Sequence, residues 1–245
     1  MVNLLAAELL KLKRSKMVLL SVIGAAFAPL MVVLAFYISK NTRPAEEVAG
    51  FDVLFYNTSM YTILLIGVPL YSVVTAYLFN REYVEDTLKN LLTIPVSRTQ
   101  LLLSKMLLLL LWILLLTGVA WVLTIVFGWI GQFEGLSGAL LGKTLVQYFI
   151  AGLFMFILST PIILITLVMK NYVPTIIAAL IINLVNVLAF NSEHRGLVPW
   201  AAAFDISNGT LMSTYPAWVS YLIIGSTALI CFITALIYFR KVDIH

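Results

Sequence analysis

Six long apolar segments constrain this chain more than any other feature of its sequence. Each can form about 20 helical residues, the length that a helix needs to cross a hydrocarbon layer about 30 Å thick. Lipid offers no hydrogen-bond partner to an exposed backbone, so only helices and closed barrels can cross it. We therefore expect an all-α membrane protein with six transmembrane helices, near residues 17–38, 59–79, 101–129, 144–169, 173–190 and 217–239.

The composition agrees with a membrane protein. Hydrophobic residues make up 62 % of the chain and charged residues 11 %, whereas ordinary soluble domains have about 45–50 % and about 25 %. The charged residues also lie outside the cores of the apolar segments. No linker, repeat or low-complexity tract separates these segments, so we expect residues 1–245 to form a single transmembrane domain.

The distribution of basic residues predicts the orientation in the membrane. Six spans place both termini on one side, and cytoplasmic loops are enriched in Lys and Arg. Eleven Lys and Arg residues fall on the side that holds both termini, and four fall on the other side. Both termini and the loop between the second and third spans are therefore expected in the cytoplasm. The outer loops would then lie at 39–58, 130–143 and 191–216.

Residues 2–14 have the pattern of an amphipathic helix at the membrane surface. Leucines are interspersed there with charged residues, which are Glu8, Lys11, Lys13 and Arg14. Basic residues on such a helix lie near lipid headgroups, so we predict an interfacial helix that leads into the first span. A poorly ordered basic tail is the alternative interpretation.

The polar stretch at 80–105 is patterned for contact with another protein. Spacings of i, i+4, i+7 and i+8 form a single stripe on a helix. The apolar residues at those spacings are Val84, Leu88, Leu91 and Leu92. Pro95 should end this helix, because proline lacks a backbone N–H group. The segment is either a helix that floats in the headgroup layer or a docking helix for a soluble partner.

Other features concern the interior and the last outer loop. Pro161 predicts a kink in the fourth span. The loop at 191–216 mixes helix breakers with aromatic residues, which favours short helices that dip into the membrane interface over an aromatic belt around a flexible loop. Asn183 and Asn186 share one face of the fifth span. Amides within a bilayer commonly hydrogen-bond to a neighbouring helix, so we predict helix packing or self-association there, with contact to a substrate as the alternative.

The sequence holds no arrangement for enzymatic chemistry. Cys231 is the single cysteine, and His194 and His245 stand alone, so no metal site is expected. The apolar cores lack the ionisable residues that an intramembrane enzyme or an ion-coupled transporter would need. Residues 137–144 approach a phosphate-binding loop, but Ser137 stands where its first glycine belongs. We therefore expect no catalytic residue, no cofactor and no nucleotide hydrolysis by that route.

Residues 80–98 resemble the segment between the second and third spans of ABC-2-type transporter permeases. The shared elements are Arg81-Glu82, Thr87-Leu88, Leu91-Leu92 and Pro95-Val96-Ser97-Arg98. Asp86 departs from this pattern, in which glycine is common before the threonine. The resemblance extends over the spans and loops of the whole chain. Within the family, residues 8–16 look most like the permeases of bacitracin- and lantibiotic-resistance exporters.

This resemblance implies a multi-pass permease in a bacterial cell membrane that exports or expels an amphipathic peptide antibiotic, such as bacitracin or a lantibiotic. It also implies a homodimer bound to two copies of a separate ATPase subunit, which would bind ATP and Mg²⁺. Membrane lipid is an expected partner and nucleic acid is not. The coupling helix that fits a groove on the ATPase would comprise Arg81, Glu82, Tyr83, Glu85, Thr87, Leu88, Leu91 and Leu92.

Other functions remain open at this point. The substrate could be a lipid-linked or another small compound, and the sequence does not fix the direction of transport. The chain could instead be a membrane scaffold that recruits a soluble protein through the same helix and transports nothing. A channel-like pore is disfavoured, because the sequence shows no selectivity filter.

Overall fold

The computed structural model describes residues 2–13, 15–39, 50–84 and 97–241, and all regular structure in this part of the chain is helical. Five helices in it are long and apolar enough to cross a membrane, and a bent helix pair makes a sixth. The predicted all-α class is therefore confirmed, and the described residues hold five or six candidate spans where six were predicted. The long helices are α2 (Met17–Ser39), α6 (Arg98–Ile130), α9 (Tyr172–Ala189) and α11 (Ala217–Lys241). The broken spans are α3 (Phe51–Met60) with η1 (Tyr61–Leu65) and α4 (Gly67–Val84), and α7 (Gly138–Ile157) with α8 (Thr160–Met169).

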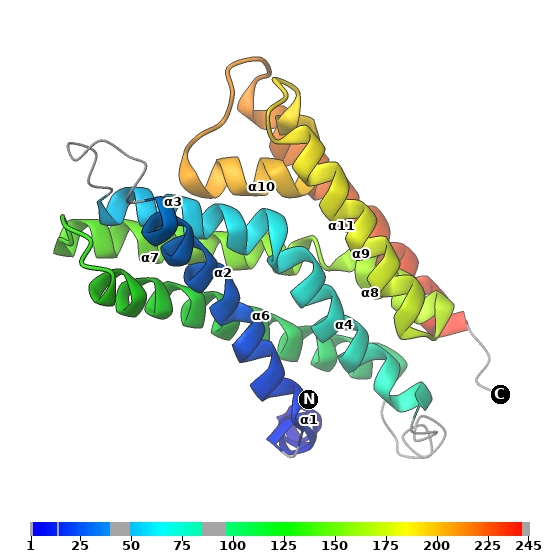
Figure 1. The fold of residues 1–245 in the computed structure, drawn as a ribbon. Helices are drawn as coiled ribbons and strands as arrows, with labels where there is room; N and C mark the ends of the chain where they lie inside the picture. The colour runs from blue at the N-terminus through cyan, green and yellow to red at the C-terminus, as the bar shows by residue number, and fades with distance from the viewer. Residues whose placement is uncertain (1, 14, 40–49, 85–96, 242–245) are drawn as a thin grey trace.

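Three short helices lie at the two ends of the bundle (Figure 1). They are α1 (Val2–Lys13), the 3₁₀ turn η2 (Arg195–Leu197) and α10 (Pro199–Asn208). The basal end is the end that holds α1, the last turn of α4 and the first turn of α6. The apical end is the end that holds η2 and α10, at the top of Figure 1. The assignment of the basal end to the cytoplasm stays a prediction from the basic residues.

The second span begins earlier than the sequence indicates. We expected a loop up to residue 58, but α3 starts at Phe51. Phe51, Leu54, Phe55 and Thr58 are buried, at the i, i+3, i+4 and i+7 spacing of a helix that packs on one face. The expected boundary was wrong because polar residues on the other face of α3, such as Asp52, resemble loop sequence.

A π-helical turn and a glycine bend this span by 48°. The turn is η1, in which the N–H group of Ile66 donates to the carbonyl oxygen of Tyr61 over 2.8 Å. Gly67 follows, and a Cβ at this position would overlap the carbonyl oxygen of Thr62. Wide turns of this kind commonly bend helices at functional sites. The bend therefore depends on the absence of a side chain at residue 67.

The helix α4 occupies the centre of the bundle, in contact with α2, α6, α8 and α9. Its buried residues lie on every side of the helix, as expected for an element that is covered all round. They are Gly67, Val68, Tyr71, Ser72, Val74, Thr75, Ala76, Leu78, Phe79 and Asn80. By contrast, α9 is the least buried of the spans.

The fourth and fifth spans confirm two local predictions. The fourth breaks at Leu158 and Ser159, and Pro161 occupies the first turn of α8, where its missing N–H group is tolerated. Lys170 then ends α8 in the left-handed conformation with φ of 50°. Asn171 caps α9 by accepting a hydrogen bond from the backbone N–H of Val173 at 3.0 Å. This tight connection makes α8 and α9 neighbours, as expected.

Candidate functional site

Only the first residues of the predicted coupling helix are described, and they lie in the last turn of α4 at the basal end. Arg81 belongs to the last turn of α4, and its guanidinium carbon lies 5.7 Å from the ring centre of Tyr77. Glu82 and Tyr83 continue the same helix, so these residues prolong the second span rather than start a separate helix. The other predicted coupling residues, Glu85, Thr87, Leu88, Leu91 and Leu92, lie outside the described residues.

The chain enters α6 through a capped and fastened first turn. The side chain of Ser97 accepts a hydrogen bond from the backbone N–H of Gln100 at 3.2 Å, which caps the helix. Nη1 of Arg98 donates to the carbonyl oxygens of Phe239 and Arg240 at 3.5 and 3.3 Å. In return, Nε of Arg240 donates to Oγ1 of Thr99 at 3.1 Å. These contacts, which we call the basal clasp, join the start of α6 to the last turn of α11.

A buried ion cluster connects α1 to α4 and α6. Nζ of Lys105 lies 3.6 Å from Oε2 of Glu8 and donates to the carbonyl oxygen of Leu78 at 2.7 Å. Nζ of Lys11 donates to the other carboxylate oxygen of Glu8 at 2.9 Å. Glu8 and Lys105 are only 5 % and 3 % exposed. We call Glu8, Lys11, Lys105 and the Leu78 carbonyl the basal cluster.

The basal cluster corrects two expectations from the sequence. Glu8 was expected on the polar face of an interfacial helix, but it faces the protein because Lys105 offers it a cation. Lys105 was one of the eleven basic residues counted on the side of the termini, whereas it lies buried within α6. Of the other residues predicted for the interfacial helix, Lys13 ends α1 but its side chain is not described, and Arg14 lies outside the described residues.

The charges around Glu8 change its pKa. Burial raises the pKa of this carboxyl group, because a low-dielectric environment disfavours the charged form. The charge of Lys105 and the hydrogen bond from Lys11 act in the opposite direction and outweigh burial, so the pKa of Glu8 is lowered. Glu8 is therefore ionised at neutral pH and holds α1 against α6.

A second contact fixes the junction of α1 and α2. The hydroxyl of Tyr77 on α4 donates to Oγ of Ser15 at 2.8 Å. The Tyr77 ring packs edge-on against Trp112 of α6, with ring centres 6.3 Å apart. Nε1 of Trp112 in turn donates to Oγ of Ser21 in α2 at 3.0 Å. The last turns before the predicted coupling segment are thus tied to α1, α2 and α6.

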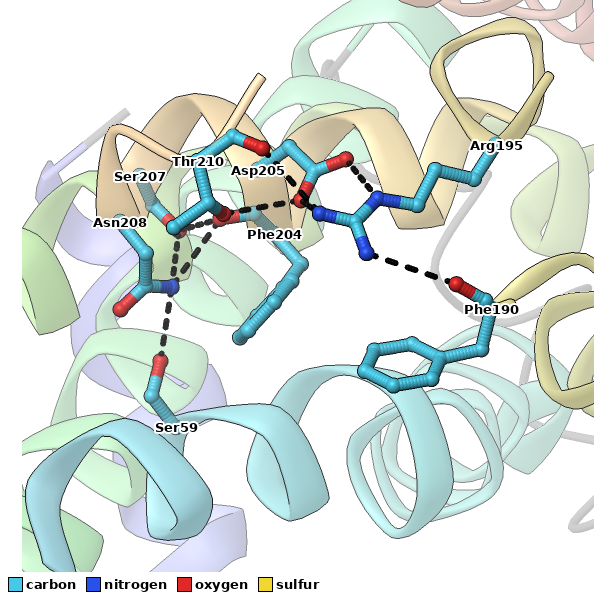
Figure 2. Close-up of polar contacts among 8 residues, drawn as sticks. All are labelled: Ser59, Phe190, Arg195, Phe204, Asp205, Ser207, Asn208 and Thr210. Atoms are coloured by element: carbon cyan, nitrogen blue, oxygen red, sulfur yellow. Dashed lines mark hydrogen bonds and ion pairs between the residues drawn. The ribbon is translucent and has the colours of Figure 1, made fainter. Parts of the chain in front are cut away.

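An ion pair at the apical end was not anticipated from the sequence (Figure 2). Nε and Nη2 of Arg195 each lie 2.8 Å from one carboxylate oxygen of Asp205, which gives a two-point contact. Asp205 is fully buried and Arg195 is 8 % exposed. Burial raises the pKa of Asp205, with Thr210 and Arg195 opposing this effect. In the sequence, Arg195 counted only as one of the loop charges, and nothing there linked it to Asp205.

Further hydrogen bonds fasten α10 to the neighbouring helices (Figure 2). Arg195 also donates to the carbonyl oxygens of Phe190 at 3.4 Å and Thr210 at 3.1 Å. Nδ2 of Asn208 donates to Oγ of Ser59 in α3 at 3.1 Å. Gly209, at φ of 71°, turns the chain so that Oγ1 of Thr210 reaches Asp205 at 2.9 Å. The apical cluster comprises Ser59, Phe190, Arg195, Phe204, Asp205, Ser207, Asn208 and Thr210.

The predicted short helix in the last outer loop is therefore present as α10, but protein covers it. Ala202 and Asp205 are fully buried, and Phe204 is nearly so. The helix contacts α7, α11 and η2. It packs between other helices at the apical end instead of lying at the membrane surface.

The two amides of α9 lack hydrogen bonds within the described part of the chain. Asn186 is fully buried, and neither its oxygen nor its nitrogen has a partner there. The side-chain oxygen of Asn183 is also buried without a partner. The predicted hydrogen bonds from these residues to a neighbouring helix therefore do not form inside the described chain. Contact with a second copy or with substrate stays a prediction.

Among the residues described, no three His, Cys, Asp or Glu side chains come together in a way that could hold a metal ion. The sites that the structure does build are polar clusters at the two ends of an apolar helical bundle. Such an arrangement belongs to a polytopic membrane protein whose ends are braced by ionic and amide contacts.

Comparison with known proteins agrees with this class. Residues 4–186 match the family described as ABC-2 family transporter protein, and the chain belongs to that family. It is therefore a multi-pass membrane protein of a transporter. The chain is 51 % identical over 207 residues to the bacitracin transport permease protein BCRB of Bacillus licheniformis. The aligned region covers 84 % of this chain and the whole of that protein.

Proposed function

We propose that this chain is the permease subunit of an ATP-driven transporter that expels bacitracin or a similar amphipathic peptide from a bacterial membrane. The observation that carries the proposal is the 51 % identity to a bacitracin transport permease over that protein's whole length. The interior of the bundle is mostly apolar, which suits an amphipathic peptide better than a small hydrophilic ion.

The energy for transport would come from a separate ATPase that docks at the basal end. Residues 85–96 connect α4 to α6 there, and their sequence carries the coupling-helix pattern. In our proposal, Glu82 and Glu85 make polar contacts with the ATPase, and Leu88, Leu91 and Leu92 pack into its groove or against α6. The assembly would contain two copies of each subunit, with ATP and Mg²⁺ on the ATPase.

The brace around this segment supports a role in transmitting movement. The basal cluster ties α4 and α6 to α1, and the basal clasp ties α6 to α11. A displacement of the docking segment would therefore move α1, α4, α6 and α11 together. Rigid-body movement of packed helices is a common form of such switching.

The first experiment is purification of the tagged chain from its native cells in mild detergent, followed by mass spectrometry of the bound proteins. Recovery of a stoichiometric ATPase with a phosphate-binding loop supports the proposal. Recovery of a partner without such a loop would replace it with the membrane scaffold. Expression of both subunits in a sensitive bacterium should raise the bacitracin concentration needed to stop growth, and no change would exclude bacitracin as substrate.

A double variant tests the coupling helix itself. Glu82→Lys with Leu88→Asp reverses one charge and places another on the apolar stripe, so the ATPase should no longer co-purify although the spans still insert. Lys16→Glu is the control, because Lys16 is an exposed basic residue before α2 that does not belong to the predicted coupling helix. Retention of the ATPase by the double variant would contradict the docking role.

A further inference from the structure

The last span, α11, is buried near its two ends and not in between. Ser220 and Ile224 are buried near its first turn, and Ala235 and Phe239 near its last. None of residues 225–234 is buried. A helix of 25 residues is about 37 Å long at about 1.5 Å per residue. The middle of this stiff helix lies along α8, where Oγ1 of Thr160 donates to the carbonyl oxygen of Ala228 at 3.3 Å, and further contacts hold each end.

The basal clasp holds one end of this helix. The last four carbonyl groups of a helix have no partner within the helix, and Arg98 donates to two carbonyls of the last turn of α11. A cation at this position also interacts favourably with the negative end of the helix dipole. Because Arg98 is the first residue of α6, α11 is attached directly beyond the predicted docking segment.

The apical cluster lies at the other end of α11. Oγ of Ser220 donates to the carbonyl oxygen of Gly196 in η2 at 3.0 Å. Gly196 follows Arg195, whose guanidinium holds Asp205 of α10. A Cβ at Gly196 would lie only 3.2 Å from Oγ of Ser220, so the two elements touch closely. The first turn of α11 is thus hydrogen-bonded to the residue next to Arg195, whose ion pair with Asp205 holds α10.

From these two attachments we propose that Arg98 is a positioning residue for transport, which fastens α11 to α6 so that α11 carries movement of the docking segment to the apical cluster. This inference rests on the proposed ATP-driven function. In this inference, α11 transmits a displacement at the basal end to α10. Ser220 is the matching residue at the apical end of the path.

The test follows the apical loop while ATP is hydrolysed at the basal end. For the labelling, the complex with its ATPase is reconstituted in lipid nanodiscs, which leave both ends of the bundle accessible, from a chain with Cys231→Ser and Met212→Cys. Met212 is 42 % exposed and lies two residues beyond Thr210. A membrane-impermeant maleimide then measures the labelling rate of Cys at this position, with and without ATP and vanadate.

In the parent chain the labelling rate should change when ATP and vanadate are added. Arg98→Ala should lose this change while it still binds the ATPase and hydrolyses ATP, so transport per ATP falls. Arg98→Lys keeps a cation at the end of α11 and should restore part of the response. Ser220→Ala, at the opposite end, should lose the response without any change near the ATPase. Lys16→Ala, an exposed residue at the basal end, is the control and should behave as the parent.

Three results would overturn the inference. An unchanged ATP response in Arg98→Ala would show that α11 is not the path, as would the absence of any response in the parent. Loss of the ATPase from Arg98→Ala would show that Arg98 serves docking instead of transmission. If Arg98→Ala does not fold, Arg240→Ala, which removes the bond to Thr99, and Ser220→Ala decide the matter. Failure to recover any ATPase refutes the proposed function itself, which is a separate outcome.

Discussion

The bend in the second span makes a specific prediction for Gly67→Ala. The new Cβ would overlap the carbonyl oxygen of Thr62 and lie 3.1 Å from Cε2 of Tyr71. The Tyr71 ring can move slightly, but the Thr62 oxygen is a backbone atom of the π-helical turn. The clash can be relieved only if η1 shifts or the bend of 48° opens.

The size of the effect follows from two opposing terms. Overpacking of a tight site typically costs about 1–3 kcal/mol, and a backbone obstacle places this site at the upper end. Alanine is favoured over glycine within a helix by about 1 kcal/mol. Gly67→Ala should therefore lower the free energy of unfolding by about 2 kcal/mol, measured by titration with SDS in mixed micelles and followed by circular dichroism.

Gly118→Ala provides the matched control. Gly118 lies within α6, and a Cβ there would meet nothing within 4 Å. This variant should gain up to about 1 kcal/mol from helix propensity alone. If Gly67→Ala were as stable as Gly118→Ala, the close approach of residue 67 to the Thr62 carbonyl would be wrong, and with it the account of the bend.

Three further predictions concern the two clusters and the contact between α3 and α6. Asp205→Ala leaves Arg195 buried without its carboxylate and should lower the free energy of unfolding by about 3–5 kcal/mol. The double variant Asp205→Leu with Arg195→Met should lower it far less, because no charge is left unpaired. Equal losses in the two variants would show that the pair is not buried. Because the pKa of Glu8 is lowered in the folded chain, its contribution is present above the ordinary Glu pKa of about 4.3 and is lost as the pH falls through the lowered value. Protease cleavage of α1 should therefore increase in acid, and Glu8→Gln should be cleaved readily at every pH; cleavage of the parent that ignores pH would contradict this. At Gly128, a Cβ would lie 2.5 Å from Cε1 of Phe51, so Gly128→Ala should destabilise the bundle by about 1–3 kcal/mol, and a neutral result in the same titration would place α3 elsewhere.

The sequence predicted those features that depend on the chain's local pattern. The length of the apolar segments predicted the helical class and the candidate spans, since each segment must cross the same hydrocarbon layer. Pro161 marked the break in the fourth span because its missing N–H group has a local effect. The short connection at Lys170 and Asn171 likewise fixed α8 beside α9.

The features that were missed depend on contacts between distant residues. The start of α3 was missed because Asp52 resembles loop sequence. Phe51 and Leu54 are buried only because they pack against α6, a contact between distant residues. Glu8 and Lys105 are 97 positions apart in the sequence, and only the packing of α1 on α6 shows that both are buried. The bond between Arg195 and Asp205 requires the turn of η2 into α10, which no periodicity encodes.

The unpaired amide of Asn186 bears on how easily the bundle can change shape. A buried polar group without a partner costs about 1–3 kcal/mol, and α9 is also the least buried span. A hydrogen bond at 3.2 Å between the hydroxyl groups of Thr175 and Thr166 holds the first turn of α9 against α8, whereas the unpaired Asn186 amide lies near the other end of α9. A movement of α9 that brought the Asn186 amide to a hydroxyl or carbonyl group would remove this cost. The unpaired amide therefore favours a displacement of this end of α9.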